Sequence, residues 1–332
     1  MIGSAPALPF LTVDLPGIGG VLRTTDEDFQ VDELLAYDPS GEGDHIFARI
    51  EKRGLSTPQA AEAMARQLDV PVRDVGWAGM KDKRAVTRQT LSFPPPCTPE
   101  AVQAVAVPGI VVQEVTRHRH KLRTGHVRRN RFTLRVRELE IDEETAAERA
   151  RAILDTLSRA PGSPNWFGAQ RFGNTGDNAD IGRALVTGAP LPRGMRRPRG
   201  RKLRFYVSAL QSQLFNEYLQ ARMQDGLYRT VLPGDVLQKR ESGGSFCSTE
   251  PAVDQQRLDR GELVLTGPMF GHKVMLPPAD SPAGERERAL LAAHELATET
   301  FTRVGKLGFG TRRPLAVDLG ATSVSTSGER AI

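Results

Sequence analysis

Apolar and polar residues alternate in three separate stretches of the first 140 residues, and this pattern restricts the fold more than any other feature. The stretches are residues 28–34, 45–51 and 131–137. Strict alternation puts every second side chain on one face, which is typical of strands that bury one face and expose the other. A turn-forming segment at residues 38–43 separates the first two stretches. The N-terminal part is therefore predicted to form a half-exposed sheet.

Helical signals dominate after a segment rich in proline and glycine at residues 160–164. Capping residues and apolar spacing predict helices over residues 178–185, 206–223 and 281–302. Before that segment the same signals predict helices over residues 57–68 and 142–157. The shift in composition predicts a domain boundary near residue 160.

A single carboxylate, Asp82, lies among four cationic residues in the segment 76–89, namely Lys81, Lys83, Arg84 and Arg88. Nearby cations favour the ionised form of a carboxylate. An ionised carboxylate can act as nucleophile or general base at neutral pH. Asp82 is therefore a candidate catalytic residue, and a charged surface turn is the alternative that these residues alone leave open.

Positive charge is concentrated in two segments, although the net charge of the whole chain is only +5. Residues 117–137 and 193–204 are rich in arginine and lysine and contain no acid. Such density favours a phosphate backbone through counterion release. Glycine interrupts both segments, which disfavours an amphipathic membrane helix. The predicted RNA-backbone contacts are Arg117, Lys121, Arg128, Arg129, Arg196 and Arg197; a solvated surface is the alternative.

A second unusual segment, residues 165–173, combines three aromatic residues with Arg171 and two glycines. Aromatic rings and guanidinium planes can stack on unpaired bases. An aromatic core turn that is pinned by Arg171 is the structural alternative.

Taken together, these segments resemble the signatures of the TruD family of tRNA pseudouridine synthases. The first family motif is matched by Gly79, Lys81, Asp82, Ala85, Thr87 and Gln89, and residues 165–173 match the second motif at almost every position. The segments 28–33, 121–132 and 208–216 also resemble family segments. The resemblance covers residues 21 to 315, after which the family normally continues with a strand rich in aromatic residues.

The resemblance implies an α+β enzyme that converts uridine to pseudouridine at position 13 of tRNA. A catalytic domain with a mixed, mainly antiparallel sheet of the pseudouridine synthase type would comprise residues 1–160 and 306–332. A TruD-specific α+β domain would be inserted at residues 161–305. In this family the aspartate of the first motif is catalytic, which gives that role to Asp82. The implied substrate-binding residues are Phe29, Lys81, Asn130 and Phe132, and Lys81 would anchor the Asp82 carboxylate or a phosphate.

No cofactor, metal ion or membrane-spanning segment is expected for this chain. The isomerisation needs no cofactor, and no metal or dinucleotide motif is present in the sequence. No apolar run approaches the ~20 residues that span a bilayer. Two lone cysteines do not make a disulfide framework, so we expect a cytoplasmic protein. The expected partner is tRNA, and we expect a monomer with no obligate protein partner. A catalytically weak or silent RNA-binding or RNA-folding protein of the same fold is the alternative.

Overall fold

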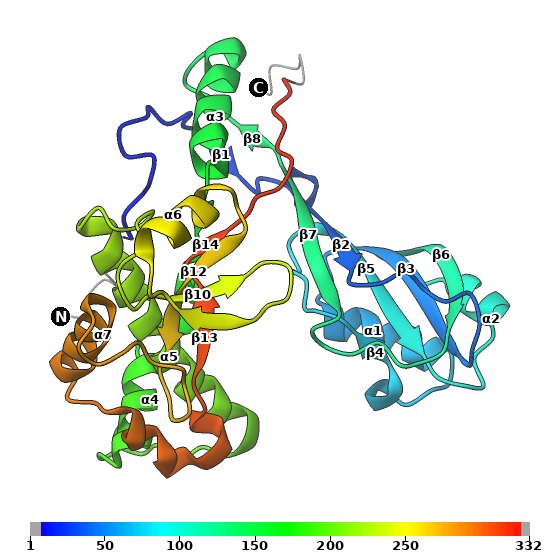
Figure 1. Cartoon of the computed structure of the whole chain (residues 1–332). Helices are drawn as coiled ribbons and strands as arrows, with labels where there is room; N and C mark the ends of the chain where they lie inside the picture. The colour runs from blue at the N-terminus through cyan, green and yellow to red at the C-terminus, as the bar shows by residue number, and fades with distance from the viewer. Residues whose placement is uncertain (1–7, 327–332) are drawn as a thin grey trace. The chain divides into compact units, whose positions relative to one another are not determined.

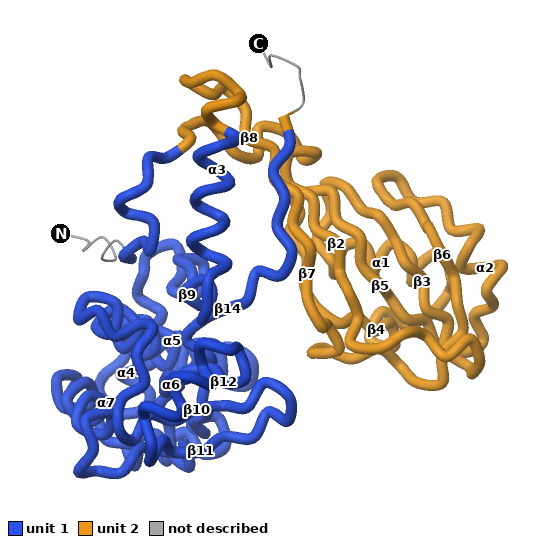
Figure 2. Tube along the Cα trace, turned by 45° about the horizontal axis from the view of Figure 1, so that its top comes forward, with its two compact units in different colours: residues 1–17, 147–325 blue, residues 18–146, 326–332 orange. Residues whose placement is uncertain are grey.

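The computed structural model describes residues 8–326 and divides them into two compact units (Figure 1, Figure 2). One unit consists of residues 18–146 with Thr326, and the other of residues 8–17 and 147–325. The boundary near residue 146 falls within helix α3 (Glu143–Ser158). No helix among the described residues is long and apolar enough to cross a membrane.

A six-stranded sheet forms the centre of the unit 18–146, in the order β6-β3-β5-β2-β7, with β4 paired to β5. The strands are β2 (Phe29–Leu35), β3 (His45–Arg53), β4 (Gly76–Trp77), β5 (Val86–Phe93), β6 (Ile110–His118) and β7 (Val127–Leu134). The pair β2–β5 is parallel and the other pairs are antiparallel. The short strands β1 (Val21–Leu22) and β8 (Val136–Arg137) pair separately. The sheet is thus mixed and mainly antiparallel, as predicted.

Helix α1 (Thr57–Gln67) covers one face of this sheet, and the short helix α2 (Pro99–Gln103) packs near its edge. Ser56 caps α1 by accepting a hydrogen bond from the Gln59 amide. Apolar residues at alternate positions of β3, including Ile46 and Ile50, pack with Met64 of α1 in a buried core. Lys52 continues the same alternation, so a charged residue occupies the last inward-facing position of this strand.

The other unit contains a four-stranded antiparallel sheet in the order β11-β10-β12-β13. Its strands are β10 (Val236–Lys239), β11 (Ser245–Cys247), β12 (Leu263–Met269) and β13 (Thr311–Pro314), and β9 (Ser163–Pro164) pairs with β14 (Ala316–Val317). The helices are α4 (Asn178–Thr187), α5 (Gly200–Gln224), α6 (Pro251–Asp259) and α7 (Pro282–Ala293). Helix α5 contributes Leu214 and Phe215 to the two cores of this unit.

The predicted helix 281–302 is two elements in the structure. Helix α7 ends at Ala293, and a 3-10 segment follows at Thr298–Gly308. Glu295 between them has a φ of 53°, a left-handed conformation that cannot continue a right-handed helix. The interruption is therefore a property of the backbone at Glu295.

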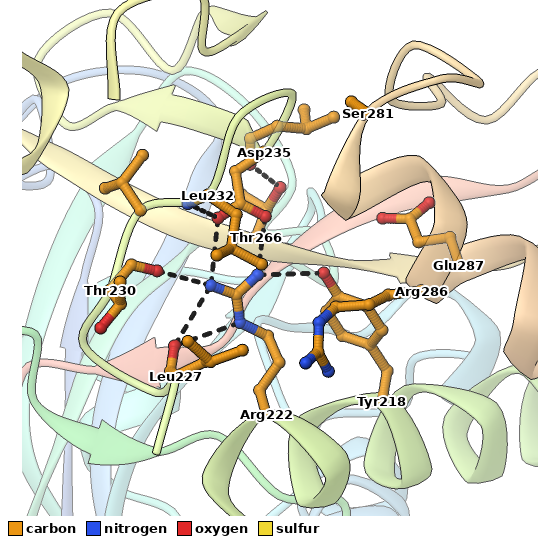
Figure 3. A network of polar contacts seen from close by, with 12 residues as sticks. Tyr218, Arg222, Leu227, Thr230, Leu232, Asp235, Thr266, Ser281, Arg286 and Glu287 are labelled. Atoms are coloured by element: carbon orange, nitrogen blue, oxygen red, sulfur yellow. Dashed lines mark hydrogen bonds and ion pairs between the residues drawn. The ribbon is translucent and has the colours of Figure 1, made fainter. Parts of the chain in front are cut away.

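A buried ion pair ties helix α5 to the segment before β10 (Figure 3). The fully buried guanidinium of Arg222 donates to both carboxylate oxygens of Asp235, at 2.6 and 3.0 Å. It also donates to the backbone carbonyls of Thr230 and Leu227 and to the Tyr218 hydroxyl. The second Asp235 oxygen accepts a further hydrogen bond from the Leu232 amide. The charges of this pair are thus surrounded by hydrogen-bond partners.

The predicted domain boundaries at residues 160 and 305 differ from the division by contacts. Residues 306–325 group with residues 147–305, because β13 pairs with β12 and β14 with β9. Residues 1–7 and 327–332 of the predicted catalytic domain lie outside the described residues. The functional assignment of these segments stays a prediction.

Candidate active site

Asp82 lies in the irregular turn between β4 and β5, and its side chain is 47% exposed. In the described structure its carboxylate is paired with Arg23, whose Nη2 lies 3.4 Å from Oδ2. Arg23 has a φ of 61°, a left-handed conformation that a residue with a side chain rarely adopts. Such conformations cost on the order of 1–3 kcal/mol and gather at functional sites.

Three of the cationic residues that neighbour Asp82 in sequence form no ion pair with its carboxylate in the described structure. Lys83 and Arg84 are exposed, and Arg88 pairs with Asp32 and Glu51 on β2 and β3. The carboxylate thus receives its charged hydrogen bond from a residue 59 positions away and not from its own segment.

A fully buried lysine, Lys52, holds the backbone of the turn. Its Nζ donates to the carbonyl oxygens of Asp82 at 2.8 Å and of Leu55 at 2.6 Å. Burial lowers the pKa of this ammonium to about 8, although the Asp82 carboxylate opposes the shift. Lys52 therefore connects the end of β3 to the residue that carries the candidate catalytic group.

Lys81 makes a different contact from the one expected. Its side chain is 5% exposed, and its Nζ lies 2.5 Å from Oε2 of the buried Glu33. The second oxygen of Glu33 accepts from the Thr90 amide at 3.1 Å. In this structure the Lys81 ammonium is therefore buried and pairs with Glu33, and not with the Asp82 carboxylate. Its geometry is that of a residue that fixes the turn, and direct binding of substrate by Lys81 stays a prediction.

The first residue of α1 completes this inner network. The Thr57 hydroxyl accepts from the Lys81 amide at 2.9 Å and donates to Gln89 Oε1 at 2.8 Å. Two motif residues, Lys81 and Gln89, are therefore joined through Thr57, the first residue of α1.

Two aromatic side chains accompany the carboxylate. The ring centres of Phe29 and Phe132 are 6.0 Å apart, with 43° between the ring planes. Phe29 is buried, whereas Phe132 is 57% exposed and has a free apolar surface. The guanidinium of Arg23 lies 3.7 Å above the centre of the Phe29 ring, so it contacts both Phe29 and Asp82. The structure thus brings together three of the predicted residues through Arg23.

Asn130 lies on the same face of β7 as Phe132, since the two residues are separated by one position. It is directly opposite Glu33 on β2 and is exposed. In the described structure its side chain has no hydrogen bond to Asp82. Its predicted contact with a bound uridine stays a prediction.

The predicted RNA-backbone residues belong to both units. Arg117, Lys121, Arg128 and Arg129 lie in the unit 18–146, whereas Arg196 and Arg197 are exposed residues of the other unit. Alternation along β7 places Arg129 on the opposite face from Asn130 and Phe132. Arg128 and Arg129 line a cavity of about 550 Å³ together with Tyr37 and Arg49. The Lys121 ammonium donates to the carbonyl of Arg73 at 2.8 Å, so this lysine is partly engaged within the protein.

The second motif forms an aromatic turn that packs on α5 and β13. The Phe167 amide donates to Asn216 Oδ1 and its carbonyl accepts from Asn216 Nδ2, both at 2.9 Å. The Phe167 ring meets Phe215 edge to face, with ring centres 5.7 Å apart. The guanidinium of Arg171 lies 5.0 Å from the same ring. This geometry is that of the structural alternative, a core turn pinned by Arg171.

Arg23, Lys52 and Thr57 were not predicted as site residues. Lys52 could have been predicted from the sequence, because a lysine at an inward position of an alternating strand needs buried hydrogen-bond acceptors. Arg23 could not have been predicted in this way, since its contacts with Phe29 and Asp82 depend on tertiary structure.

Comparisons with known proteins find similarity over most of the chain. The family profile described as tRNA pseudouridine synthase D (TruD) matches residues 8–191 and 198–332. A relative from Anaeromyxobacter dehalogenans (strain 2CP-C), named tRNA pseudouridine synthase D, is 51% identical over 307 residues, which cover 92% of this chain and 86% of the relative. A relative of the same name from Geobacter metallireducens is 38% identical over 381 residues, which cover 96% of this chain and 92% of the relative.

A solved structure has the same fold. The crystal structure of the putative tRNA pseudouridine synthase D (TruD) from Methanosarcina mazei matches with a TM-score of 0.73 and 22% identity. The match covers 92% of this chain and 86% of that one. The predicted α+β fold class is confirmed.

Proposed function

The chain belongs to the TruD family of tRNA pseudouridine synthases, and we propose that it isomerises uridine to pseudouridine at position 13 of tRNA. The observation that carries this proposal is the half-exposed Asp82 carboxylate, which lies in the family motif and is linked through Arg23 to an aromatic pair. The reaction breaks the bond between uracil N1 and ribose C1′ and forms one between C5 and C1′. The hydrogen on C5 is lost and N1 gains a proton, so no net oxidation occurs.

Asp82 is the group that acts on the ribose. It either attacks C1′ as a nucleophile or removes the proton from C2′ as a base. Its exposed carboxylate is open to a substrate, while Lys52 and Thr57 hold the backbone on either side of it. Arg23 orients the carboxylate by hydrogen bonding to Oδ2 and leaves Oδ1 available to the ribose.

Phe132 and Phe29 form the wall for the uracil, which must leave the base stack to be reached. The exposed face of Phe132 supports stacking, and a base–aromatic stack contributes about 1–3 kcal/mol. Asn130, on the same face of β7, supplies an amide that can hydrogen-bond to the base edge.

Six basic residues contact the tRNA backbone. This role is proposed for Arg117, Lys121, Arg128, Arg129, Arg196 and Arg197 on the basis of their charge density, without sequence readout. Since the proposed substrate is tRNA, we place the reaction in the cytoplasm. We also propose that the chain acts as a monomer.

One modification assay tests the function. Purified protein is incubated with an unmodified tRNA transcript that carries uridine at position 13, and with a matched transcript that carries cytidine there. Pseudouridine should form in the first and not in the second. Binding of both transcripts without any product would instead identify an RNA-binding protein that lacks the activity.

A further inference from the structure

Two arginines in the unit 8–17 and 147–325 lie against one aromatic ring. The guanidinium carbon of Arg313 is 4.0 Å from the centre of the Phe167 ring, and that of Arg171 is 5.0 Å from it. Both side chains are half-buried. Burial lowers the pKa of each guanidinium, and the charge of Arg171 lowers the pKa of Arg313 further. The two positive charges therefore repel each other in a partly desolvated place.

No carboxylate among residues 8–326 pairs with either arginine. Arg171 donates to the Ser208 hydroxyl at 3.2 Å, and Arg313 donates to Asn165 Oδ1 at 2.5 Å, and both acceptors are neutral. The Nε–H of Arg313 is buried and has no hydrogen-bond partner in the described structure. Contact with the Phe167 ring offsets only part of this cost.

Two arginines of the same unit whose side chains are almost fully buried are neutralised by carboxylates. Arg222 is paired with Asp235, and Arg312 is paired with Glu287 at 2.8 Å. Arg312 and Arg313 are adjacent in β13, yet only the former has a carboxylate. Because partly buried charge is unfavourable without a counter-charge, an anion from outside the described chain would stabilise the two adjacent charges of Arg171 and Arg313.

The surroundings favour a polyanion. Ser208, which accepts the Arg171 hydrogen bond, lies on helix α5 at the same face as Arg204 and Arg201, which precede it by one and two turns. Arg201 and Arg204 are both exposed. A line of positive charge along α5 thus leads to the half-buried pair, as a ligand with repeated phosphates would require.

We propose that Arg171 and Arg313 bind one phosphodiester group of the substrate RNA. The identification of the ligand as RNA rests on the proposed function, whereas the phosphate site itself rests on the two unneutralised guanidiniums. Planar guanidinium forks match phosphate oxygens in a bidentate manner, and Phe167 and Asn165 hold the forks in place.

The first experiment uses inorganic phosphate alone. Thermal unfolding is followed by the fluorescence of Trp166 in a Trp77→Phe background, because Trp166 lies in this unit and Trp77 in the other. Phosphate, compared with chloride at equal ionic strength, should raise the melting temperature by mass action. Arg171→Gln and Arg313→Gln should lose this rise. Arg260→Gln is the matched control, since Arg260 already pairs with Glu262 at 2.7 Å and should keep it.

The second experiment measures tRNA affinity over a series of salt concentrations. Each of Arg171→Gln and Arg313→Gln should lower the slope of log affinity against log salt by about one, and Arg260→Gln should not. Arg171→Lys, which keeps the charge and loses the fork, should keep the slope and bind more weakly; it also serves if a glutamine variant does not fold.

The two arms separate the outcomes. A phosphate effect without a change in the tRNA slope would assign the site to a small anion and overturn the RNA proposal. Equal phosphate responses in all variants, with unchanged slopes, would leave these arginines a packing role only and overturn both parts. Failure of the wild-type protein to form pseudouridine would contradict the proposed function while leaving both binding measurements readable.

Discussion

Both units contain several arginine–aspartate pairs, and one pair from each unit, Arg222–Asp235 and Arg23–Asp82, differ in almost every respect. Arg222 and Asp235 are fully buried, are joined at 2.6 and 3.0 Å, and have further partners on both side chains. Arg23 and Asp82 are about half-exposed and meet through a single contact of 3.4 Å. The buried pair, in which both charges have several hydrogen-bond partners, stabilises the fold. The exposed pair leaves one oxygen of the Asp82 carboxylate without a partner in the described structure, and this oxygen is available for reaction.

The largest effect is expected from Asp82→Asn. The substitution keeps the shape of the side chain and removes its charge, so the rate of pseudouridine formation should fall on the order of 10⁴-fold. Affinity for tRNA should stay within about tenfold, or roughly 1.4 kcal/mol. Single-turnover kinetics and a binding titration measure the two quantities. Substantial turnover by this variant would remove Asp82 from its proposed role.

Asp235→Asn is expected to lower the stability of the protein, whereas Asp82→Asn lowers its rate of reaction. This change leaves the buried Arg222 charge without its counter-charge, and the free energy of unfolding should fall by about 3–5 kcal/mol. Urea unfolding followed by Trp166, again in a Trp77→Phe background, reports on this unit alone. Arg222→Met combined with Asp235→Asn should recover part of the loss, because the unpaired charge is then absent. A loss below about 1 kcal/mol in the single variant would show that the pair tolerates an uncompensated charge.

A smaller effect, with a characteristic pH dependence, is expected from Lys52. Lys52→Met frees the carbonyl of Asp82, and a turn displaced by about 1 Å can cost up to 10²-fold in rate. In the native protein the rate should fall as pH rises through about 8, where the Lys52 ammonium loses its proton. Lys52→Met should lack this alkaline decline. A decline that is unchanged in the variant would show that another group causes it.

The free energy of unfolding should rise with pH over the range in which the rate of reaction falls. The pKa of Lys52 is about 8 in the folded protein and 10.5 for an unperturbed lysine, so between these values the unfolded chain binds more protons. The contribution of this group to the free energy of unfolding therefore rises from about pH 8 to about pH 10.5. Urea unfolding followed by Trp77, in a Trp166→Phe background, should show this rise in the native residue and not in Lys52→Met.

The smallest change in stability is expected from Arg23→Gln. The exposed pair with Asp82 should contribute about 0–1 kcal/mol, in contrast to the buried pair of Arg222. Turnover should still fall several-fold, because the carboxylate loses the group that orients it. A loss of stability comparable to that of Asp235→Asn would end the distinction between the two pairs.

The sequence predicted the parts of the fold that depend on local pattern. The alternating stretches 28–34 and 45–51 correspond to strands β2 and β3, whereas the stretch 131–137 contains only the end of β7 and the short strand β8. Strand β7 begins at Val127 within the basic segment, where most residues are exposed on both faces and no apolar alternation can mark it. Its pairing with β2 depends on register and not on local preference.

The candidate site was predictable as far as its motifs extend. Asp82 was proposed because its segment resembles a family signature, and Phe29 and Phe132 were proposed because segments 28–33 and 121–132 resemble other family segments. Arg23 and Lys52 lie 59 and 30 positions from Asp82, and only the folded sheet brings them to it. Lys81 shows the reverse difficulty, because proximity in sequence suggested contact with the Asp82 carboxylate while the turn directs its ammonium to Glu33.

The discontinuous composition of one unit has a consequence for the order of events on the ribosome. Residues 8–17 belong with residues 147–325, and Leu11 packs against a core whose other members come from residues 166 onward. The strands of the six-stranded sheet, by contrast, all lie within residues 18–146. Since domains generally fold as they emerge, the turn that carries Asp82 can be complete while the first segment of the chain still awaits its partners. A pause in translation once residue 146 has left the ribosome would therefore expose Leu11 to chaperones while the six-stranded sheet is already formed.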